Sequence, residues 1–310
     1  LTSPRGETHV EALAINQQAQ VFVLTSHLRG RQVEDEITVF RKQGLTQTSF
    51  GVGRRETDAP RLLVTLPNGD LVMADPERYL TCYTPSGRMR WTKGQSMPGL
   101  VGLAVDELGY LYAAAWLEED LLLDGQEVLL PKRGGMMLAK YAPDGDLAWV
   151  RAFPIDGEVR DISPALQVDA AGHVYLAGSL ELIANFGPPQ VVRATPGKRN
   201  YFLASFDPNG ETRWATKFGA DRGRDGVRAF YTDRHGISFV GIGQSFWRVN
   251  AEGRPVWAGA LQGTGGESLQ ALAIGAARKD GYIYGLTEGG RYFLTKHNRL
   301  DRQTVIWEGK

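Results

Sequence analysis

The sequence contains almost no cysteine, and this limits the chemistry open to it. Cys82 is the only cysteine among 310 residues, which excludes an internal disulfide and any multi-cysteine metal cluster. The residue lies in the apolar segment 79–84, YLTCYT. A single cysteine in such a segment is typical of a small core residue, and we expect Cys82 to be buried.

The sequence also lacks an excess of charge of either sign and lacks a long apolar run. Its 35 Lys and Arg balance its 35 Asp and Glu, so no overall field favours nucleic acid or anionic lipid as a partner. No run approaches the roughly 18 apolar residues of a membrane-spanning helix, which predicts a soluble chain without a transmembrane segment. The chain begins with Leu1, which indicates a processed or excised form from which any signal peptide or lipid anchor has gone.

One pattern of residues recurs along the chain, and it predicts β-strands. Its first half is a short apolar segment, an Asp-x-x-Gly turn and a second apolar segment, as in 103–115 and 166–178. Its second half is an apolar segment, a Pro-Asp-Gly or Pro-Asn-Gly turn and a segment with a tryptophan, as in 138–153 and 203–218. Alternating residues between such turns are typical of β-hairpins, and no segment shows the apolar stripe of a helix.

Six copies of the pattern can be counted, and each has room for four strands. The last segment of every copy carries an aromatic residue: Phe50, Trp91, Trp149, Trp214, Trp257 and Trp307. Repeats of roughly 40 residues with four short strands are typical of β-propellers. We therefore predict an all-β fold, a single β-propeller domain over 1–310 with six blades of four antiparallel strands, at about 8–53, 58–94, 98–153, 161–219, 225–260 and 267–310.

The segment 168–219 contains VDAAGHVYLAGS, NFG and YFLASFDPNGETRWATKFG. It resembles the bacterial β-propeller repeat often called the SBBP repeat and is similar, more loosely, to NHL-type repeats. The resemblance is strongest over 100–243. It implies a bacterial protein that is secreted, periplasmic or held at the cell envelope as a lipoprotein. Such repeats are commonly associated with seven blades, which is the alternative to six.

Two insertions interrupt the repeat between its second and third strands, at 116–135 and 180–200. Each reads as two apolar runs around a glycine-containing turn, which predicts an additional hairpin. Both insertions lie on one face, where exposed apolar and basic residues would suit a partner. The candidates for this binding face are Trp116, Lys132, Arg133, Phe186, Lys198 and Arg199. The alternative is that the insertions only decorate the repeat.

Carboxylates stand at equivalent positions before the inner strands of several copies. Asp161, Asp225 and Glu267 share this position, and Asp58 matches it less closely. Because these loops open near the central channel, Asp161, Asp225 and Glu267 could together hold Ca²⁺ or another hard cation. The alternative, which the regular spacing favours, is that each carboxylate accepts hydrogen bonds from the backbone of a neighbouring blade.

Two other repeated positions have structural explanations. Asp106, Asp169 and Asp233 each follow the first strand of a copy, where a carboxylate can accept hydrogen bonds from the next backbone amides. The tryptophans recur at a fixed place in the last strand, which indicates packing between blades.

The sequence also lacks the motifs of common enzymes. Its five histidines form no HExxH pair, no GxSxG motif is present, and the glycine-rich segment 263–268 has no lysine of the phosphate-loop kind. We therefore expect a non-catalytic, extracytoplasmic binding or scaffold protein without a cofactor other than Ca²⁺. It would bind a protein or glycan through the insertion face, as a monomer or within a larger envelope assembly. The alternative is a propeller-type hydrolase, lyase or lactonase with a divalent metal at the channel mouth.

Overall fold

The structure is a computed structural model. It describes residues 8–29, 32–41, 46–55, 61–75, 79–93, 97, 99–130, 134–156, 166–180, 182–221, 226–260, 262, 270–277, 280–286, 292–297 and 303–309. The regular structure of these residues consists of 28 β-strands and no helix, which confirms the all-β prediction. It follows that no helix able to cross a membrane occurs in the described ranges.

The chain divides into two compact units, and each is described by itself. The first comprises Leu1–Ala115, Leu121–Glu127 and Ala139–Ala148. The second comprises Trp116–Asp120, Val128–Leu138 and Trp149–Lys310. The single domain over 1–310 stays a prediction.

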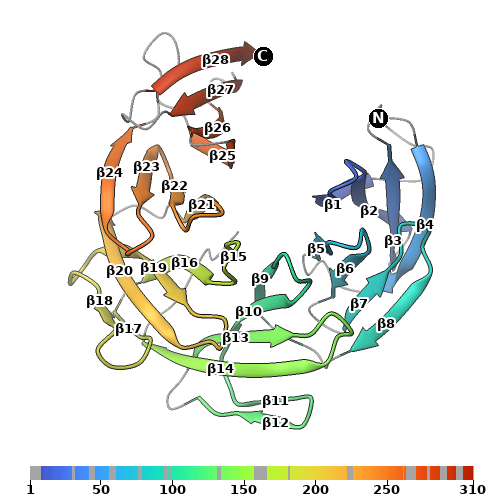
Figure 1. Cartoon of the computed structure of the whole chain (residues 1–310), viewed down its shortest axis with the longest axis horizontal. Helices are drawn as coiled ribbons and strands as arrows, with labels where there is room; N and C mark the ends of the chain where they lie inside the picture. The colour runs from blue at the N-terminus through green and yellow to red at the C-terminus, as the bar shows by residue number, and fades with distance from the viewer. Residues whose placement is uncertain are drawn as a thin grey trace. The chain divides into compact units, whose positions relative to one another are not determined.

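The first unit contains two complete antiparallel sheets, each built from four strands in chain order (Figure 1). The strands of the first sheet are β1 (Thr8–Ile15), β2 (Val21–Arg29), β3 (Gln32–Phe40) and β4 (Thr46–Arg55). Those of the second are β5 (Leu62–Thr65), β6 (Leu71–Ala74), β7 (Leu80–Tyr83) and β8 (Met89–Lys93). Each sheet is therefore the four-stranded meander that the repeat predicts.

The third copy of the repeat has residues in both units. Its four strands are β9 (Leu100–Val105), β10 (Leu111–Leu117), β13 (Gly135–Tyr141) and β14 (Leu147–Asp156). Between β10 and β13 a separate two-stranded sheet is formed by β11 (Leu121–Leu123) and β12 (Gln126–Val128).

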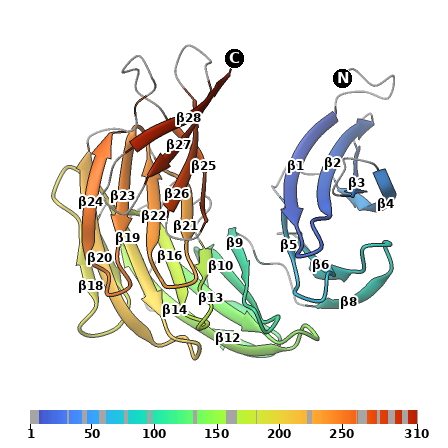
Figure 2. The ribbon, with the colours of Figure 1, turned by 45° about the horizontal axis from the view of Figure 1, so that its top comes forward.

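The second unit continues with three more four-stranded sheets, which follow one another side by side (Figure 2). Their strands are β15 (Leu166–Val168), β16 (Val174–Leu180), β19 (Arg199–Phe206) and β20 (Thr212–Asp221); β21 (Val227–Thr232), β22 (Ser238–Ile242), β23 (Ser245–Val249) and β24 (Pro255–Ala260); and β25 (Gln270–Ala277), β26 (Asp280–Leu286), β27 (Tyr292–His297) and β28 (Gln303–Gly309). Two short strands, β17 (Ile183–Asn185) and β18 (Val191–Arg193), lie between β16 and β19 in the chain.

The repeated aspartates close the turns between the first and second strands. The Oδ1 atoms of Asp106, Asp169 and Asp233 each accept hydrogen bonds from the amides two and four residues ahead, at 2.8–3.0 Å. The other carboxylate oxygen of Asp169 accepts a bond from the Tyr175 hydroxyl at 2.9 Å. Burial, followed by the neighbouring Asp169 charge, raises the pKa of Tyr175 to about 12, so the hydroxyl stays a donor. The structural role predicted for these aspartates is confirmed.

The repeated tryptophans link each repeat to the next. The indole N–H groups of Trp91, Trp149 and Trp214 donate to backbone carbonyls in the last turn of the following repeat, those of Pro143, Pro208 and Ala251, at 3.2, 3.1 and 2.9 Å. The rings lie against turn glycines with φ near +80 to +90°, namely Gly145, Gly210 and Gly253. Packing between repeats is confirmed for these three tryptophans, and Phe50 makes the same contact with Gly87.

The core lies between neighbouring sheets. In the first unit Phe22, Leu24 and Ile37 pack against Leu63 and Leu71 of the next sheet. Cys82 is buried as predicted, with 1% of its surface exposed.

A charged cluster that the sequence did not predict is buried in the same unit. The Arg61 guanidinium pairs with Asp35 at 2.6 Å and with Asp75 at 2.9 Å, and Ser26 donates a hydrogen bond to Asp35. Because Asp35 belongs to the first sheet and Arg61 immediately precedes the second, the cluster joins the two sheets.

Candidate functional site

The two insertions form hairpins, as predicted, and the second one has a specific docking place. The first contains the β11–β12 pair, and the second contains β17 and β18, which pair antiparallel through Ile183–Asn185 and Val191–Arg193. Strand β17 also pairs with the outer edge of β14, where Ala184 lies opposite Ile155 and Ile183 opposite Asp156. The second hairpin therefore extends the sheet of the preceding repeat by strand addition.

The β17–β18 hairpin is also tied to its own repeat. The Thr212 hydroxyl, at the start of β20, donates to the Phe186 carbonyl, and the Ala215 amide donates to the Gln190 side chain at 3.1 Å. Within the turn the Gly187 amide donates to Asn185 at 3.0 Å. The hairpin is thus held by β14 on one side and by β20 on the other.

The prediction that Phe186 is exposed is wrong. Only 1% of its surface is exposed. Its ring lies 5.2–6.1 Å from those of Phe153, Phe202 and Phe206, measured between centroids. These three phenylalanines come from β14 and β19 and form the apolar floor on which the hairpin rests. Burial of this ring removes apolar surface from water and is what anchors the turn.

The remaining candidates divide between described and undescribed residues. Trp116, at the end of β10, is half-buried, and its ring lies against Gly134. Lys198 is exposed in the turn before β19, and Arg199 is the first residue of that strand. Trp116 and Phe186, whose ring contacts the structure describes, contact other residues and not each other. The candidates that lie outside the described residues are Asp58, Lys132, Arg133, Asp161, Asp225 and Glu267. Their proposed roles in binding a partner or Ca²⁺ stay predictions.

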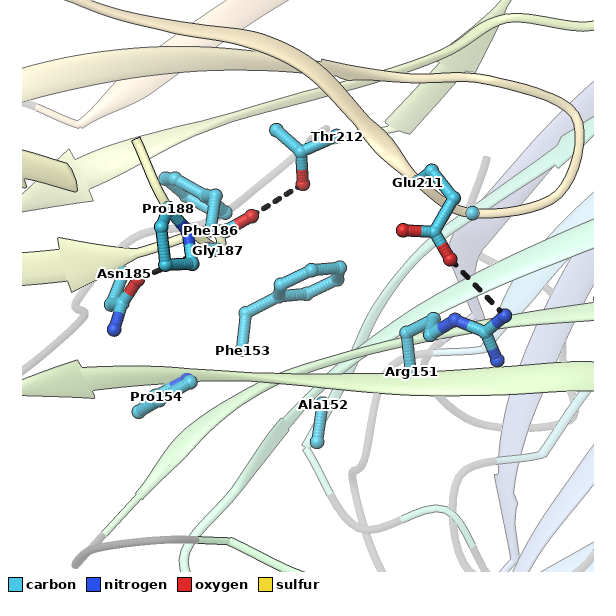
Figure 3. A pocket seen from close by; sticks show the side chains of 11 residues that line it. Arg151, Ala152, Phe153, Pro154, Asn185, Phe186, Gly187, Pro188, Glu211 and Thr212 are labelled. Carbon is cyan, nitrogen blue, oxygen red and sulfur yellow. Dashed lines mark hydrogen bonds and ion pairs between the residues drawn. The ribbon is translucent and has the colours of Figure 1, made fainter. Parts of the chain in front are cut away.

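A cavity of about 350 Å³ opens beside the hairpin. It is bounded by β14, by the β17–β18 turn and by the β19–β20 turn (Figure 3). In Figure 3 the Phe153 side chain, which lines the cavity, lies between Asn185 and Pro188 on one side and Arg151 and Glu211 on the other. We call this cavity the hairpin groove. Its volume is at the lower end of that of small-ligand sites and would hold one or two side chains.

Arg151 is the charged group that is best fixed in the hairpin groove. Its guanidinium donates to the Asn209 carbonyl at 3.3 Å, lies 5.7 Å from the Trp149 ring centroid and is 3.5 Å from a Glu211 carboxylate oxygen. The side chains of Arg151 and Glu211 are 41% and 72% exposed. Such an exposed pair contributes under about 1 kcal/mol, so a ligand can replace Glu211 at little cost.

Sequence reasoning missed these groove residues, although one signal was present. Arg151 follows Trp149 by two residues, as Lys93 follows Trp91. Lys93 makes the equivalent ion pair with Asp146, at 2.5 Å. The charged pair therefore recurs in two repeats. The β17–β18 hairpin, which forms one wall of the groove, lies beside the Arg151–Glu211 pair.

Neither a family model nor a curated protein matches the chain. Several solved structures are similar to it. The WD40 domain of Pan2 from Neurospora crassa has 12% identity and a TM-score of 0.59, over 96% of this chain and 78% of that one. Sqt1 from Chaetomium thermophilum, solved with the N-terminus of ribosomal protein L10, has 9% identity and a TM-score of 0.56, over 97% and 74%. The polysaccharide lyase Uly1 has 11% identity and a TM-score of 0.56, over 99% and 82%.

At these identities the similarity concerns the fold alone. The resemblance to SBBP-type repeats has no family model behind it, and the number of blades stays a prediction. With four-stranded antiparallel meanders in both units and propellers among its structural relatives, the chain has a β-propeller fold.

Proposed function

We propose that this chain is a non-catalytic β-propeller that binds a partner protein at the β17–β18 hairpin and the hairpin groove. The observation that carries the proposal is the docking of the hairpin. It is fixed by β14 and β20, yet it exposes 57% of Leu182 and 39% of Val191 to solvent. A rigid scaffold that presents apolar side chains beside a groove suits recognition of another protein.

The repeated residues support this assignment because they already serve the scaffold. The aspartates and tryptophans described above bond within their sheets or to the next repeat. The β17–β18 hairpin is one of two places where the chain departs from the repeat, and functional sites are additions to a fold rather than properties of it. Sqt1, one of the similar propellers, was solved with the N-terminus of a ribosomal protein, and we extend that kind of partner, a protein, to this chain.

Location outside the cytoplasm is a second part of the proposal. It rests on the resemblance of 168–219 to SBBP-type repeats. Fractionation of cells that produce the protein from its own gene tests it, and recovery of the protein only with cytoplasmic markers would overturn it.

Site-specific photo-crosslinking tests partner binding. A benzophenone amino acid at Val191 is expected to give a discrete adduct with one protein in cells of the source organism. Val256 on β24 is the matched control, since it is also a valine near a strand start and 49% of its surface is exposed. An adduct at both positions, or at neither, would contradict a partner site at the hairpin.

A further inference from the structure

We infer that the hairpin groove binds an extended peptide, which adds to the open edge of β14 in line with β17 and places a carboxylate on Arg151. This inference rests on the proposed function and names the form of the partner. Its first support is that β14 already accepts a strand on this edge. Strand β17 pairs there with Ile155 and Asp156, and its geometry defines the direction of a second, antiparallel strand.

The edge remains open next to that pairing. Strand β14 spans ten residues, and β17 is the outer neighbour that the described strands provide for it. Among the described residues, Val150–Pro154 therefore offers five residues, roughly 17 Å, without an outer strand. Within this stretch Pro154 has no amide N–H, and the Val150 carbonyl accepts a hydrogen bond from the Arg151 guanidinium at 3.1 Å, which a peptide would have to replace. The backbone groups that point outward from such an edge are a template for β-addition.

The edge is also accessible. Trp149, Val150, Arg151 and Ala152 are partly exposed, while Phe153 is buried under the hairpin. The open stretch thus begins where β17 ends at Asn185 and the chain turns at Gly187 toward β18. A peptide would meet the turn at one end and continue toward Trp149.

Register decides which peptide side chains enter the hairpin groove. Trp149, Arg151 and Phe153 alternate along β14 on the face that carries the groove. Residues directly opposite each other in an antiparallel pair project to the same face. The peptide residue opposite Arg151 therefore projects into the groove beside the guanidinium.

The charge of that residue follows from the fixed position of Arg151. The guanidinium is held by the Asn209 carbonyl and the Trp149 ring, whereas Glu211 is 72% exposed. A peptide carboxylate can displace Glu211 and form a charge-assisted bond that becomes partly shielded from water. We expect an acidic residue at this position and backbone bonds on both sides of it.

The test uses a phage-displayed library of random linear peptides, selected on the full chain. Selected peptides are expected to carry Asp or Glu at one common position. On binding they should slow deuterium exchange of the β14 amides between Trp149 and Pro154. Arg151→Gln should weaken binding about tenfold. Lys93→Gln is the matched control, since it removes the equivalent cation of the preceding repeat and should leave the affinity unchanged.

A second measurement separates strand addition from side-chain binding. N-methylation of alternate peptide amides removes the donors that face β14 in one set and those that face solvent in the other. One set should weaken binding at least about tenfold and the other should not. Equal affinity of the two sets, or protection outside β14, would overturn strand addition. A sugar or other non-peptide ligand would leave the β14 amides unprotected and overturn it as well.

Partner binding at the hairpin and strand addition to β14 would be refuted by different results. An adduct at Val191 in cells, with no peptide selected in vitro, would leave partner binding standing and refute strand addition. Peptides that add to β14, with no adduct at Val191, would support the edge as a binding site and refute a physiological partner at the hairpin.

Discussion

At the scale of single residues, the contact between a tryptophan and a turn glycine recurs at Trp91, Trp149 and Trp214. Gly210 combines two demands, because its φ is +82° and an added Cβ would lie 2.9 Å from the Trp149 ring. Gly197 has only the first demand, since its φ is +69° and nothing lies within 4 Å of its added Cβ. The two glycines therefore separate backbone strain from the ring contact.

We predict that Gly197→Ala lowers the free energy of unfolding by about 1 kcal/mol, the cost of a left-handed residue with a side chain. Gly210→Ala should lower it by about 1–3 kcal/mol more, because the ring must also move. Urea unfolding followed by circular dichroism measures both. Equal losses in the two variants would show that the Trp149 contact adds nothing.

Cys82 gives a second prediction at this scale. Burial, followed by the Asp70 charge, raises the pKa of its thiol from 9.0 to about 12. Because the folded-state pKa is the higher one, the thiol stabilises the fold below pH 9, and this contribution is lost as the pH rises toward 12.

The thiol should therefore react with a disulfide reagent at pH 8 only as fast as the protein unfolds. The reaction is followed by the absorbance of the released thiolate, with and without urea. Fast labelling of the folded chain would contradict the burial of Cys82.

At the scale of elements, one hydroxyl helps to hold the β17–β18 hairpin against β20. Thr212 donates to the Phe186 carbonyl, so Thr212→Val leaves that carbonyl without its donor. The expected cost is about 1 kcal/mol, confined to the hairpin. Amide exchange in β17 and β18 should accelerate about fivefold under conditions where exchange reports local opening.

Thr216→Val is the control for this prediction. Thr216 lies on the same strand, four residues further on, and is also half-buried. Its substitution should leave hairpin exchange unchanged. Equal acceleration in both variants would mean that β20 as a whole, and not the Thr212 bond, holds the hairpin.

The hairpin also shows how far the sequence could predict the structure. Turn chemistry is local, so the Asp-x-x-Gly turns, the positive-φ glycines and the two extra hairpins were predictable from adjacent residues. The docking of β17 on β14 was not, because Ala184 and Ile155 are joined only by the register of two distant segments. Phe186 looked exposed beside Gly187 and Pro188, since Phe153, Phe202 and Phe206 become its neighbours only in the folded chain.

The charged residues show the same difference between local and distant contacts. Asp35 lies in the acidic segment VEDE, which is typical of a solvated surface, yet it is 2% exposed and pairs with Arg61. Its partner lies in another repeat, so no pattern of neighbouring residues predicts this ion pair. Arg151 was more predictable, because its counterpart Lys93 occupies the same place after Trp91.

At the scale of the whole molecule, a simple measurement tests whether the repeated carboxylates bind Ca²⁺. We expect Asp161, Asp225 and Glu267 to accept backbone hydrogen bonds and not to hold Ca²⁺. An ion that binds only the folded state raises its stability. The thermal midpoint should therefore agree within about 1 °C between EDTA and Ca²⁺.

A midpoint several degrees higher in Ca²⁺ would instead favour a metal at the channel mouth and revive the enzymatic alternative. In that case Asp161→Asn should abolish the difference. Asp207→Asn is a suitable control, since Asp207 accepts amide bonds in an exposed turn.

The tryptophan contacts make each repeat depend on the next one along the chain. In each unit an aromatic ring of one repeat is received by the turn of the next, as with Trp91 and Gly145 or Trp149 and Gly210. A single repeat isolated from the chain would have a ring without its turn glycine and a turn glycine without its ring. Shortening or lengthening such a chain preserves its joints only when the cut falls at the same point in two copies, so that a foreign ring meets an equivalent glycine.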